Sequence, residues 1–575
     1  MTRAVDRWAT PAVTALVGAL YAGTACRWVL GSDSAEFAAV LARGGVPHPS
    51  GYPLYALWLR AFAWLPTSPA HAASLATAAL GALSVWLVAW AARRWGATPR
   101  ASALAALAFG LAPITWKLST EPEAFAPNAA LAALILGLAA PAALPRGAWR
   151  VGALGLAAGL GLSNHLTIVF LLPTGVVAVT HALRRERAGL RAVPLGLLGL
   201  ALGLAPYLWL RFAARGPDVW AWGETETWRG LLHHLLRLDY GALRHGVSGQ
   251  RDVVGQLGLL GWTLLAGNAL VWLLGLSGLA LTTLGLERRA GAWAMAASGA
   301  LAGPILVSWS NVSMNELALV VMERFHLLPL VPLAVLSALG LDAWRARLRH
   351  VGAVVDACVV ASALVSAGFG WPTLREAHRP TVEQWARRVL SYAPSRAVVL
   401  GTGDVRVFPL AYARAVGVRP DVVYVDLSLL HHRWYRRWVS SQLGYAVVEP
   451  IGESVDTVAV AWQAISAGRP VFATNSFAPG FDRKLVIYPA GPIFRAALGG
   501  APPPTAEIER DVAATERDDE PEPVRYGGWA GDLVEWRARA WLWIADAYGD
   551  DGDLDGRRRA YERARALAPW LMTLE

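Results

Sequence analysis

Two carboxylates stand close together in SDSAEF, residues 32–37, directly after an apolar run. Asp33 and Glu36 are three residues apart, so on a helix they share one face. A carboxylate at a helix start beside a bilayer is well placed to accept a proton from a bound hydroxyl. The pattern also fits a capping box, with Asp33 as the N-cap and Glu36 reaching back to its backbone amide. Both a catalytic and a capping role remain open for this pair.

The next stretch, GGVPHPSGYP, predicts a compact turn that presents His48 and Tyr52. PLYALWLRAFAWL then predicts an amphipathic helix lying in the membrane interface. We therefore take His48 and Tyr52 as candidate substrate-binding residues.

A second polar loop, WKLSTEPEAFAPN, contains Lys117, Glu121 and Glu123. Glu121 stands before Pro122, where a charge favoured by the dipole at a helix start is the simpler interpretation. The alternative is that both glutamates contact a substrate.

Two further segments place polar residues beside apolar runs. GLSNHLTIVFLLP contains Asn164 and His165, either in a simple tight turn between spans or on a substrate path. VMERFHLLPLVP brings Arg324 to the outer boundary of a span, the depth of a phosphate on a lipid carrier, and arginine is suited to clamp such a group.

The long segment VWAWGETETWRGLLHHLLRLDYG is rich in Trp, Arg and His. Its tryptophans could anchor the chain in the membrane interface, or their rings could stack on a sugar. The candidate substrate-binding residues of this segment are Trp222, Arg237 and Tyr240. His233 and His234 are adjacent and face different directions on a helix, which is not metal-ligand spacing. We predict no metal site.

The composition of the chain indicates a membrane protein. Of the 575 residues 55% are hydrophobic and 16% charged, and the mean hydropathy is +0.38, more apolar side chain than one globular core buries. The net charge of +10 reflects arginines in short loops between apolar runs, which argues against nucleic-acid binding. Cys26 and Cys358 lie inside apolar runs and indicate no redox compartment. The first apolar run lacks a cleavage pattern and is predicted to be an uncleaved span.

Runs of 16 to 25 apolar residues predict about eleven spans. They lie near residues 10–30, 71–92, 101–116, 122–140, 147–162, 165–183, 189–213, 255–285, 290–310, 320–342 and 349–371. Alternate loops are rich in arginine and are predicted to be cytoplasmic, which places the candidate residues on the outer face. An odd number of spans from a cytoplasmic N-terminus also puts the C-terminal region outside the cytoplasm.

The chain changes character after the last span. Residues 375–500 alternate short β-branched runs with helical ones, which predicts an α/β domain. Its GTGD lacks the later glycine of a dinucleotide fingerprint. Residues 501–527 have the composition of a linker, and 528–575 predict a helical hairpin similar to one tetratricopeptide repeat, a form that often binds protein partners.

The order of these motifs resembles the protein O-mannosyltransferase-like membrane family. The resemblance rests on DSAEF with VPHPSGYPLY, the W-x4-E-x-E-x-F-x2-N pattern, SNHLTIV, WAWGETETWRGLLHHLLRLDYG and RPDVVYVDLSLLHHRWY, and it covers nearly the whole chain. It implies a GT-C glycosyltransferase fold over residues 1–372 and a sugar donor on a polyprenyl phosphate. It further implies a bacterial relative, in the cytoplasmic membrane, of the eukaryotic enzyme with a tetratricopeptide tail.

The resemblance also implies roles for residues. The essential acid of the first outer loop falls on Asp33, with Glu36 close by, although the family's better-known members have an adjacent acidic pair instead of D-x-x-E. Asp33 would deprotonate the acceptor hydroxyl of a protein or glycan, which displaces the lipid phosphate with inversion. Arg324, His165 and Lys117 would stabilise that phosphate, without a cofactor.

Two other function classes compete with this one. A transporter or flippase also needs polar residues between spans, but near the midplane and usually in paired repeats, which this sequence lacks. A membrane scaffold that recruits partners through its tail leaves the outer-loop motifs unexplained.

Overall fold

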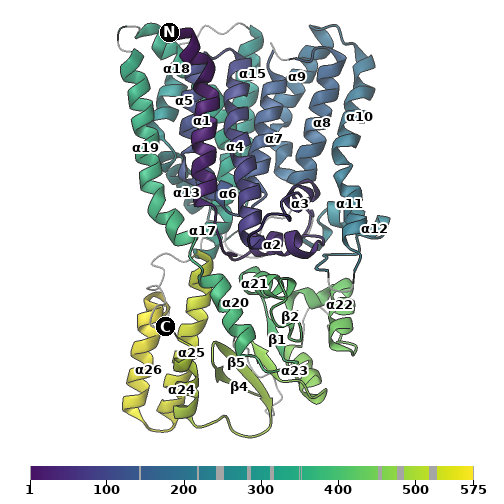
Figure 1. Ribbon diagram of the computed structural model, residues 1–575, viewed down its shortest axis with the longest axis vertical. Helices are drawn as coiled ribbons and strands as arrows, with labels where there is room; N and C mark the ends of the chain where they lie inside the picture. Colours follow the sequence, from purple (N-terminus) through teal and green to yellow (C-terminus); the bar gives the residue numbers. More distant parts are fainter. Residues whose placement is uncertain are drawn as a thin grey trace. The chain divides into compact units, whose positions relative to one another are not determined.

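The computed structural model describes most of the chain. The described residues are 2–141, 144–216, 219–240, 252–280, 286–310, 312, 316–348, 350, 352–450, 456–475, 485–516 and 528–573. The chain divides into two compact units (Figure 1). The helical unit comprises residues 1–27, 44–221 and 225–377, and the α/β unit comprises residues 28–43, 222–224 and 378–575.

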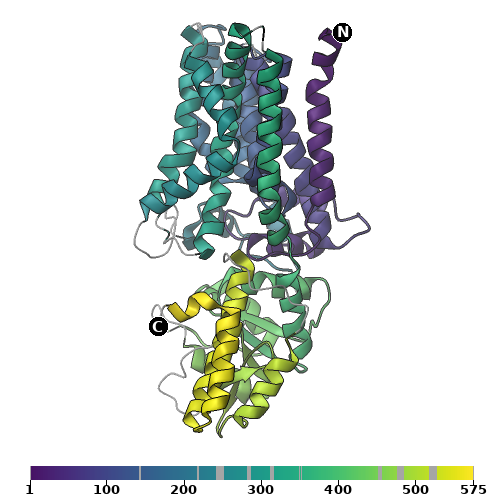
Figure 2. The same ribbon diagram turned by 90° about the vertical axis from the view of Figure 1, so that its left-hand side faces the viewer.

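The helical unit consists of helices that run side by side in both ribbon views (Figures 1 and 2). Its first half contains α1 (Thr2–Thr24), α3 (Pro53–Arg60), α4 (Pro69–Trp95), α5 (Pro99–Gly110), α6 (Pro113–Thr120), α7 (Phe125–Ala139), α8 (Ala148–Asn164), η1 (Leu166–Leu171), α9 (Leu172–Arg184), η2 (Leu190–Ala192), α10 (Val193–Leu204) and α11 (Pro206–Ala213). Its second half contains α12 (Trp228–Leu235), η3 (Leu238–Tyr240), α13 (Val253–Ala266), α14 (Ala269–Ala280), α15 (Leu286–Ala300), η4 (Leu301–Ile305), α16 (Leu306–Trp309), α17 (Glu316–Glu323), η5 (Arg324–His326), α18 (Leu327–Arg347) and α19 (Gly352–Ala377).

Local sequence signals explain where several of these helices begin. Ser68 precedes α4, and its Oγ accepts a hydrogen bond from the His71 amide at 3.2 Å. Thr98 caps α5 in the same way, and both helices start with proline, whose missing N–H costs nothing in the first turn. Gly96, with φ of 106°, ends α4 in the left-handed region that glycine adopts without strain.

The described residues include six helices long and apolar enough to cross a membrane, or eight if each of two bent pairs forms one span. The bent pairs are α5 with α6, at 67°, and α13 with α14, at 91°. Eleven spans therefore stay a prediction, because α1, α7 and α8 are not among these candidates. The predicted run 255–285 is not one straight helix, and the predicted first span ends at Thr24 instead of residue 30.

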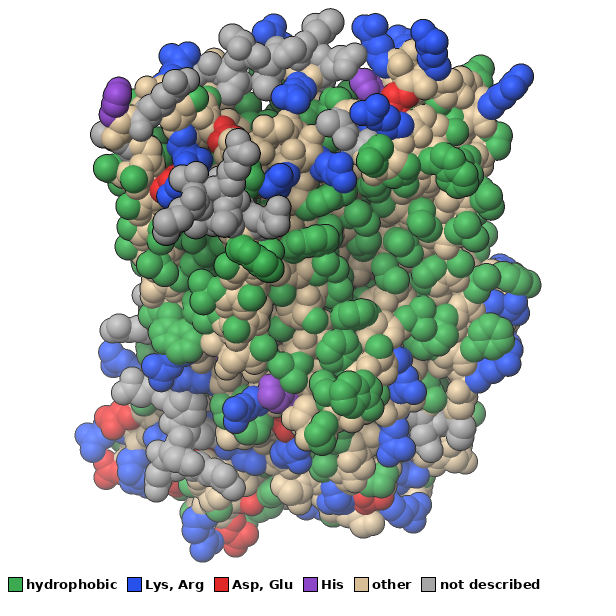
Figure 3. Space-filling model, turned by 45° about the horizontal axis from the view of Figure 1, so that its top comes forward, with side chains coloured by type: hydrophobic (Ala, Val, Ile, Leu, Met, Phe, Trp, Pro, Cys, Tyr) green, Lys and Arg blue, Asp and Glu red, His purple; other side chains and the backbone are tan. Residues whose placement is uncertain are grey.

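The surface of the helical unit suits a bilayer. Figure 3 shows a broad band of hydrophobic side chains, with Lys and Arg side chains gathered along its upper rim. Helices α4 and α18 end, and α5, α8 and α10 begin, at the same end of the unit as the N-terminus (Figure 1). The arginine-rich loops that the sequence predicts to be cytoplasmic therefore share one end of this unit.

Glycine lets α8 and α10 approach closely. A Cβ added at Gly155 would lie 2.1 Å from the Gly196 carbonyl oxygen, and one at Gly199 would lie 2.2 Å from that of Gly152. Such backbone contact is typical of helices packed within membranes, where small residues form the interface.

The α/β unit is built around a five-stranded sheet of order β2-β1-β3-β5-β4. Its strands are β1 (Val398–Gly401), β2 (Val423–Asp426), β3 (Val471–Ala473), β4 (Leu485–Ala490) and β5 (Ile493–Leu498). Its helices are α2 (Asp33–Arg43), α20 (Thr381–Tyr392), α21 (Asp404–Ala415), η7 (Ser428–His431), α22 (Arg433–Leu443), α23 (Thr457–Ser466), α24 (Thr505–Ala514), α25 (Gly528–Asp550), α26 (Leu554–Leu567) and η8 (Pro569–Thr573). β1 pairs in parallel with β2 and β3, Val399 lying opposite Tyr424 and Phe472, and β5 pairs antiparallel with β3 and β4.

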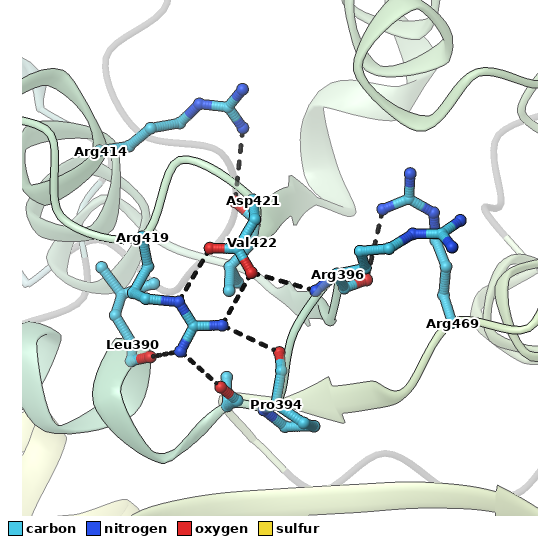
Figure 4. A network of polar contacts seen from close by, with 9 residues as sticks. Leu390, Pro394, Arg396, Arg414, Arg419, Asp421, Val422 and Arg469 are labelled. Carbon is cyan, nitrogen blue, oxygen red and sulfur yellow. Dashed lines mark hydrogen bonds and ion pairs between the residues drawn. The ribbon is translucent and has the colours of Figure 1, made fainter.

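One arginine ties the end of α20 to the strand that follows α21 (Figure 4). Arg419 donates to the carbonyl oxygens of Leu390, Ala393 and Pro394 at 2.8–3.1 Å, and both oxygens of Asp421 accept from it at 2.8 Å. These contacts satisfy carbonyls at the end of a helix that would otherwise have no partner. The Arg419 hydrogen bonds hold the pKa of Asp421 well below its usual range.

The C-terminal helices modify one prediction. Within residues 501–527, predicted to be a linker, Thr505–Ala514 form α24, and 517–527 lie outside the described residues. Apolar Ile508 and Val512 are buried on one face of α24, which explains why this acidic stretch folds. Helices α25 and α26 form a hairpin, and its likeness to a tetratricopeptide repeat stays a prediction.

Candidate functional site

The acid pair of the first loop lies on α2, in the α/β unit. Asp33 is the first residue of the helix and Ser32 precedes it, so Asp33 does not occupy the N-cap position that the capping-box interpretation requires. Ser32 Oγ donates to Asp33 Oδ1 at 2.9 Å. Glu36 is fully buried and Asp33 is 8% exposed. Both carboxylates of this pair are therefore buried.

His48 and Tyr52 lie in a turn of the helical unit, as predicted. The Tyr52 hydroxyl and His48 Nε2 are 2.9 Å apart, and the Tyr52 ring lies 5.7 Å from the ring of His165. The predicted interfacial helix after this turn is shorter than expected, because α3 ends at Arg60. The turn that carries His48 and Tyr52 therefore contacts the segment that carries His165.

His234, whose neighbour His233 does not give it metal-ligand spacing, supports this turn. A Cβ added at Gly51 would lie 2.9 Å from His234 Nε2, so the imidazole packs directly on the turn backbone. Gly51 also has φ of 89°, which favours glycine. Burial, followed by the charge of His48, lowers the pKa of His234 to about 3, and the ring is neutral at physiological pH.

His165 occupies the break between α8 and η1. Its Nδ1 lies 2.8 Å from Thr167 Oγ1 and accepts a hydrogen bond from the Thr167 amide at 3.2 Å, and Thr167 Oγ1 accepts from Asn128 Nδ2 at 3.0 Å. Asn164 Nδ2 donates to the Ala124 carbonyl at 3.0 Å. The tight-turn interpretation describes the backbone here, and the turn aims His165 at the aromatic rings of neighbouring segments.

Arg324 and Glu123 form a buried ion pair. Arg324 Nη1 lies 3.0 Å from Glu123 Oε1, and the guanidinium stands 5.6 Å from the centre of the Phe125 ring. Phe125 also contacts the rings of His165 and Phe325, at 4.9 and 5.3 Å. These side chains form one continuous group.

We call this group the histidine–arginine cluster. It consists of His48, Tyr52, Glu123, Phe125, His165, Arg324 and Phe325. Residues from four sequence segments thus meet in it, all within the helical unit. The two phenylalanines were not predicted, although Phe125 stands in the E-x-E-x-F motif and Phe325 follows Arg324.

Lys117 pairs with Glu323 and stands within electrostatic reach of Glu121 and Glu123. Glu121 follows the last residue of α6, and the next helix begins at Phe125, so Glu121 is not a charge at a helix start. Both predicted phosphate-binding cations of this region therefore have a glutamate partner.

Three predicted residues lie apart from these contacts. Trp222 belongs to the α/β unit, is 3% exposed, and packs against Phe408 and Trp434. A ring so buried is packed in a core instead of presented to a sugar. Arg237 lies near Tyr207, and the side chain of Tyr240 lies outside what the structure describes.

An apolar groove of about 680 Å³ opens on the helical unit. Its walls come from η1 and α9 on one side and from α15 and η4 on the other, and include Val169, Phe170, Val176, Trp293 and Leu301. Element η1 begins one residue after His165. Within the described ranges, no group of three or more His, Cys, Asp or Glu side chains is arranged to hold a metal ion.

Comparison with known proteins bears on this arrangement. Residues 33–188 match the family described as the protein O-mannosyl-transferase TMEM260 N-terminal domain. The chain is 28% identical over 450 residues to the protein O-mannosyl-transferase TMEM260 of Mus musculus, covering 74% of this chain and 63% of that protein. It is 24% identical over 252 residues to the Dictyostelium discoideum protein, covering 39% and 30%. The chain therefore spans less than two thirds of the length of either relative.

Solved structures share the fold. ArnT from Cupriavidus metallidurans superposes with a TM-score of 0.55 in its apo state at 14% identity, over 86% of this chain and 98% of ArnT. The same protein bound to undecaprenyl phosphate gives a TM-score of 0.53 at 13% identity. The family match and the two relatives together confirm the resemblance of the chain to the protein O-mannosyltransferase-like membrane family, and the solved structures show a shared fold.

Proposed function

We propose that this chain is a membrane glycosyltransferase that moves mannose or another hexose from a polyprenyl-phosphate-linked donor to an acceptor hydroxyl. The observation that carries the proposal is the histidine–arginine cluster, whose buried Arg324 offers a cation for a phosphate. An apolar groove on the same unit offers a surface for hydrocarbon. Support comes from the mouse protein O-mannosyl-transferase and from ArnT, whose structure holds undecaprenyl phosphate.

The proposed reaction is a single displacement with inversion. Asp33 accepts the proton of the acceptor hydroxyl while the oxygen attacks the anomeric carbon. The bond between that carbon and the phosphate oxygen breaks, and polyprenyl phosphate leaves. General-base assistance of this kind contributes about 10²- to 10⁴-fold in rate. Asp33 has this role from the family resemblance, and Glu36 supports it.

The phosphate partners in this proposal are Arg324, His165 and Lys117. Arg324 already pairs with Glu123, but a guanidinium has five N–H donors in a fixed fork and can hold a carboxylate and a phosphate together. Lys117, paired with Glu323, can likewise share its three donors. The proposal needs no metal or other cofactor.

The finer parts of the proposal concern location and partners. We place the reaction on the outer face of a bacterial cytoplasmic membrane, in a chain with about eleven spans and an extracytoplasmic C-terminal region. The acceptor is a protein or a glycan, and the helical hairpin of α25 and α26 is a surface for a protein partner.

A direct assay tests the proposal. The purified chain in vesicles is given polyprenyl-phosphate mannose or polyprenyl-phosphate glucose with a serine- and threonine-containing peptide. We expect one lipid-linked sugar to be consumed, with equal release of polyprenyl phosphate and appearance of glycosylated peptide. If neither sugar leaves its lipid with peptide or glycan acceptors, the glycosyltransferase assignment is wrong. Movement of an intact lipid-linked sugar across the vesicle would instead identify a flippase.

A further inference from the structure

The helix that carries Asp33 is held by the α/β unit, hundreds of residues away in sequence. Residues 28–43 cluster with 378–575, and α2 packs along α21. The acid-bearing helix is therefore part of the α/β unit, although it lies between two membrane segments in sequence.

The backbone just before α2 is fixed by one buried carboxylate. Glu383, in the first turn of α20, accepts a hydrogen bond from the Val29 amide at Oε2, at 3.0 Å. Its Oε1 accepts from Arg387 Nε and Nη2, at 3.0 and 2.8 Å. Glu383 is 8% exposed and Val29 is fully buried. The two oxygens of Glu383 therefore have different roles. Arg387 orients the carboxylate through Oε1, and Oε2 binds the backbone of the loop before α2.

Two further contacts complete the attachment. A Cβ added at Gly31 would lie 2.8 Å from Trp529 Cβ, so the backbone between Val29 and Asp33 rests on α25. At the other end of α2, Arg43 Nε donates to the carbonyl oxygen of Ala415, the last residue of α21, at 2.6 Å. The segment is fastened before, along and after the helix.

We infer that Glu383 is a positioning residue, which sets the place of Asp33 by anchoring the Val29 backbone. This inference rests on the proposed function, in which Asp33 is the base. A catalytic group must be held within a fraction of an ångström of its productive position, and a misplacement of about 1 Å costs roughly 100-fold in rate. Val29 is four residues from Asp33, too close for its backbone to shift without moving the helix start.

The test compares two glutamates that each pair with an arginine four residues later on the same helix. Glu383→Ala removes the anchor, and Glu535→Ala removes an ion pair of the same i, i+4 spacing on α25, where Arg539 donates to Glu535 Oε1 at 3.1 and 2.9 Å. We expect Glu383→Ala to lower kcat roughly 10- to 100-fold with KM for the donor within about twofold, and Glu535→Ala to leave both unchanged. Glu383→Gln keeps an acceptor for Val29 and should recover part of kcat.

A double variant separates this inference from the proposed function. If Glu383 acts through Asp33, Asp33→Asn with Glu383→Ala should be no slower than Asp33→Asn alone. Normal kcat in Glu383→Ala, while Asp33→Asn is impaired, would overturn the positioning role. If Asp33→Asn has normal activity, Asp33 is not the base and the proposed function is wrong on this point. The anchoring of the Val29 backbone by Glu383 is then tested by hydrogen exchange. Amides of residues 25–33 should exchange faster in Glu383→Ala than in Glu535→Ala, and equal exchange overturns the anchor.

Discussion

Glu123 and Arg324 are 201 residues apart in sequence, and their side chains meet at 3.0 Å in a buried position. A buried ion pair adds little net stability over an apolar pair, but removal of one partner costs about 3–5 kcal/mol because a buried charge remains. A protein that needs an arginine at this depth therefore needs a carboxylate beside it. Glu123 supplies that carboxylate, which explains a charge in the motif without giving it a catalytic role.

Asp33 can be tested by a substitution that conserves its shape. Asp33 accepts a hydrogen bond from Ser32 Oγ, and asparagine has nearly the same shape and an oxygen that accepts the same bond, so Asp33→Asn should change the unfolding temperature little. Transfer should fall by about 10²-fold or more, because an amide cannot accept the proton. Circular dichroism during heating and the transfer assay measure the two effects.

Glu36→Gln is the control for Asp33→Asn. If Glu36 only supports the base, Glu36→Gln should lower the transfer rate less than Asp33→Asn does. If Asp33→Asn folds and transfers sugar at the wild-type rate, the base is elsewhere. Glu36, Glu121 and Glu123 would be the next carboxylates to test.

Among the elements, the short strand β2 carries a polar residue at its buried end. Asp426 is 3% exposed and accepts hydrogen bonds from Ser428 N and Oγ. Burial raises the pKa of Asp426 from 3.8 to about 6, against the opposing effect of the Ser428 hydrogen bonds. The α/β unit therefore keeps a carboxyl group whose charged form is poorly solvated.

The shifted pKa of Asp426 predicts how stability depends on pH. The folded state binds the proton more tightly than the unfolded state, so the stabilisation is fully present below about pH 4 and is lost as the pH rises through about 6. At 1.36 kcal/mol per pKa unit, the part of this loss that falls between pH 5 and pH 6 is about 1 kcal/mol. Unfolding of the full chain at pH 5 and pH 7.5 should show a smaller difference for Asp426→Asn than for wild type. The same pH dependence in both proteins would contradict this prediction.

For the whole molecule, the side of the membrane on which the α/β unit lies is predicted from the arginine-rich loops. Ala514→Cys, exposed at the end of α24, should react with a membrane-impermeant thiol reagent in intact spheroplasts. Arg184→Cys, exposed at the end of α9, should react only after lysis. Both variants are made in a Cys358→Ser background, since Cys358 is exposed and Cys26 is buried. The reverse labelling pattern would place the α/β unit in the cytoplasm.

The sequence by itself determined the class of this protein. Long apolar runs can satisfy their backbone only as helices in a bilayer, so the membrane helices and their arginine-rich loops follow from composition and spacing. The change to β-branched runs after residue 375 likewise predicted the strands of the α/β unit. The order of the motifs indicated the resemblance to the protein O-mannosyltransferase-like family, which the family match and the mouse relative confirm.

Tertiary structure alone decided which residues meet. The pairing of Arg324 with Glu123 and the contact of His165 with Phe125 depend on how distant helices pack, which no local pattern encodes. The bend between α13 and α14 and the folding of α24 also depend on neighbouring elements. The same holds for α2, whose sequence between two membrane segments predicts a membrane loop. Its buried residues instead found their apolar partner in α21, and Glu383 holds its backbone from 354 positions away.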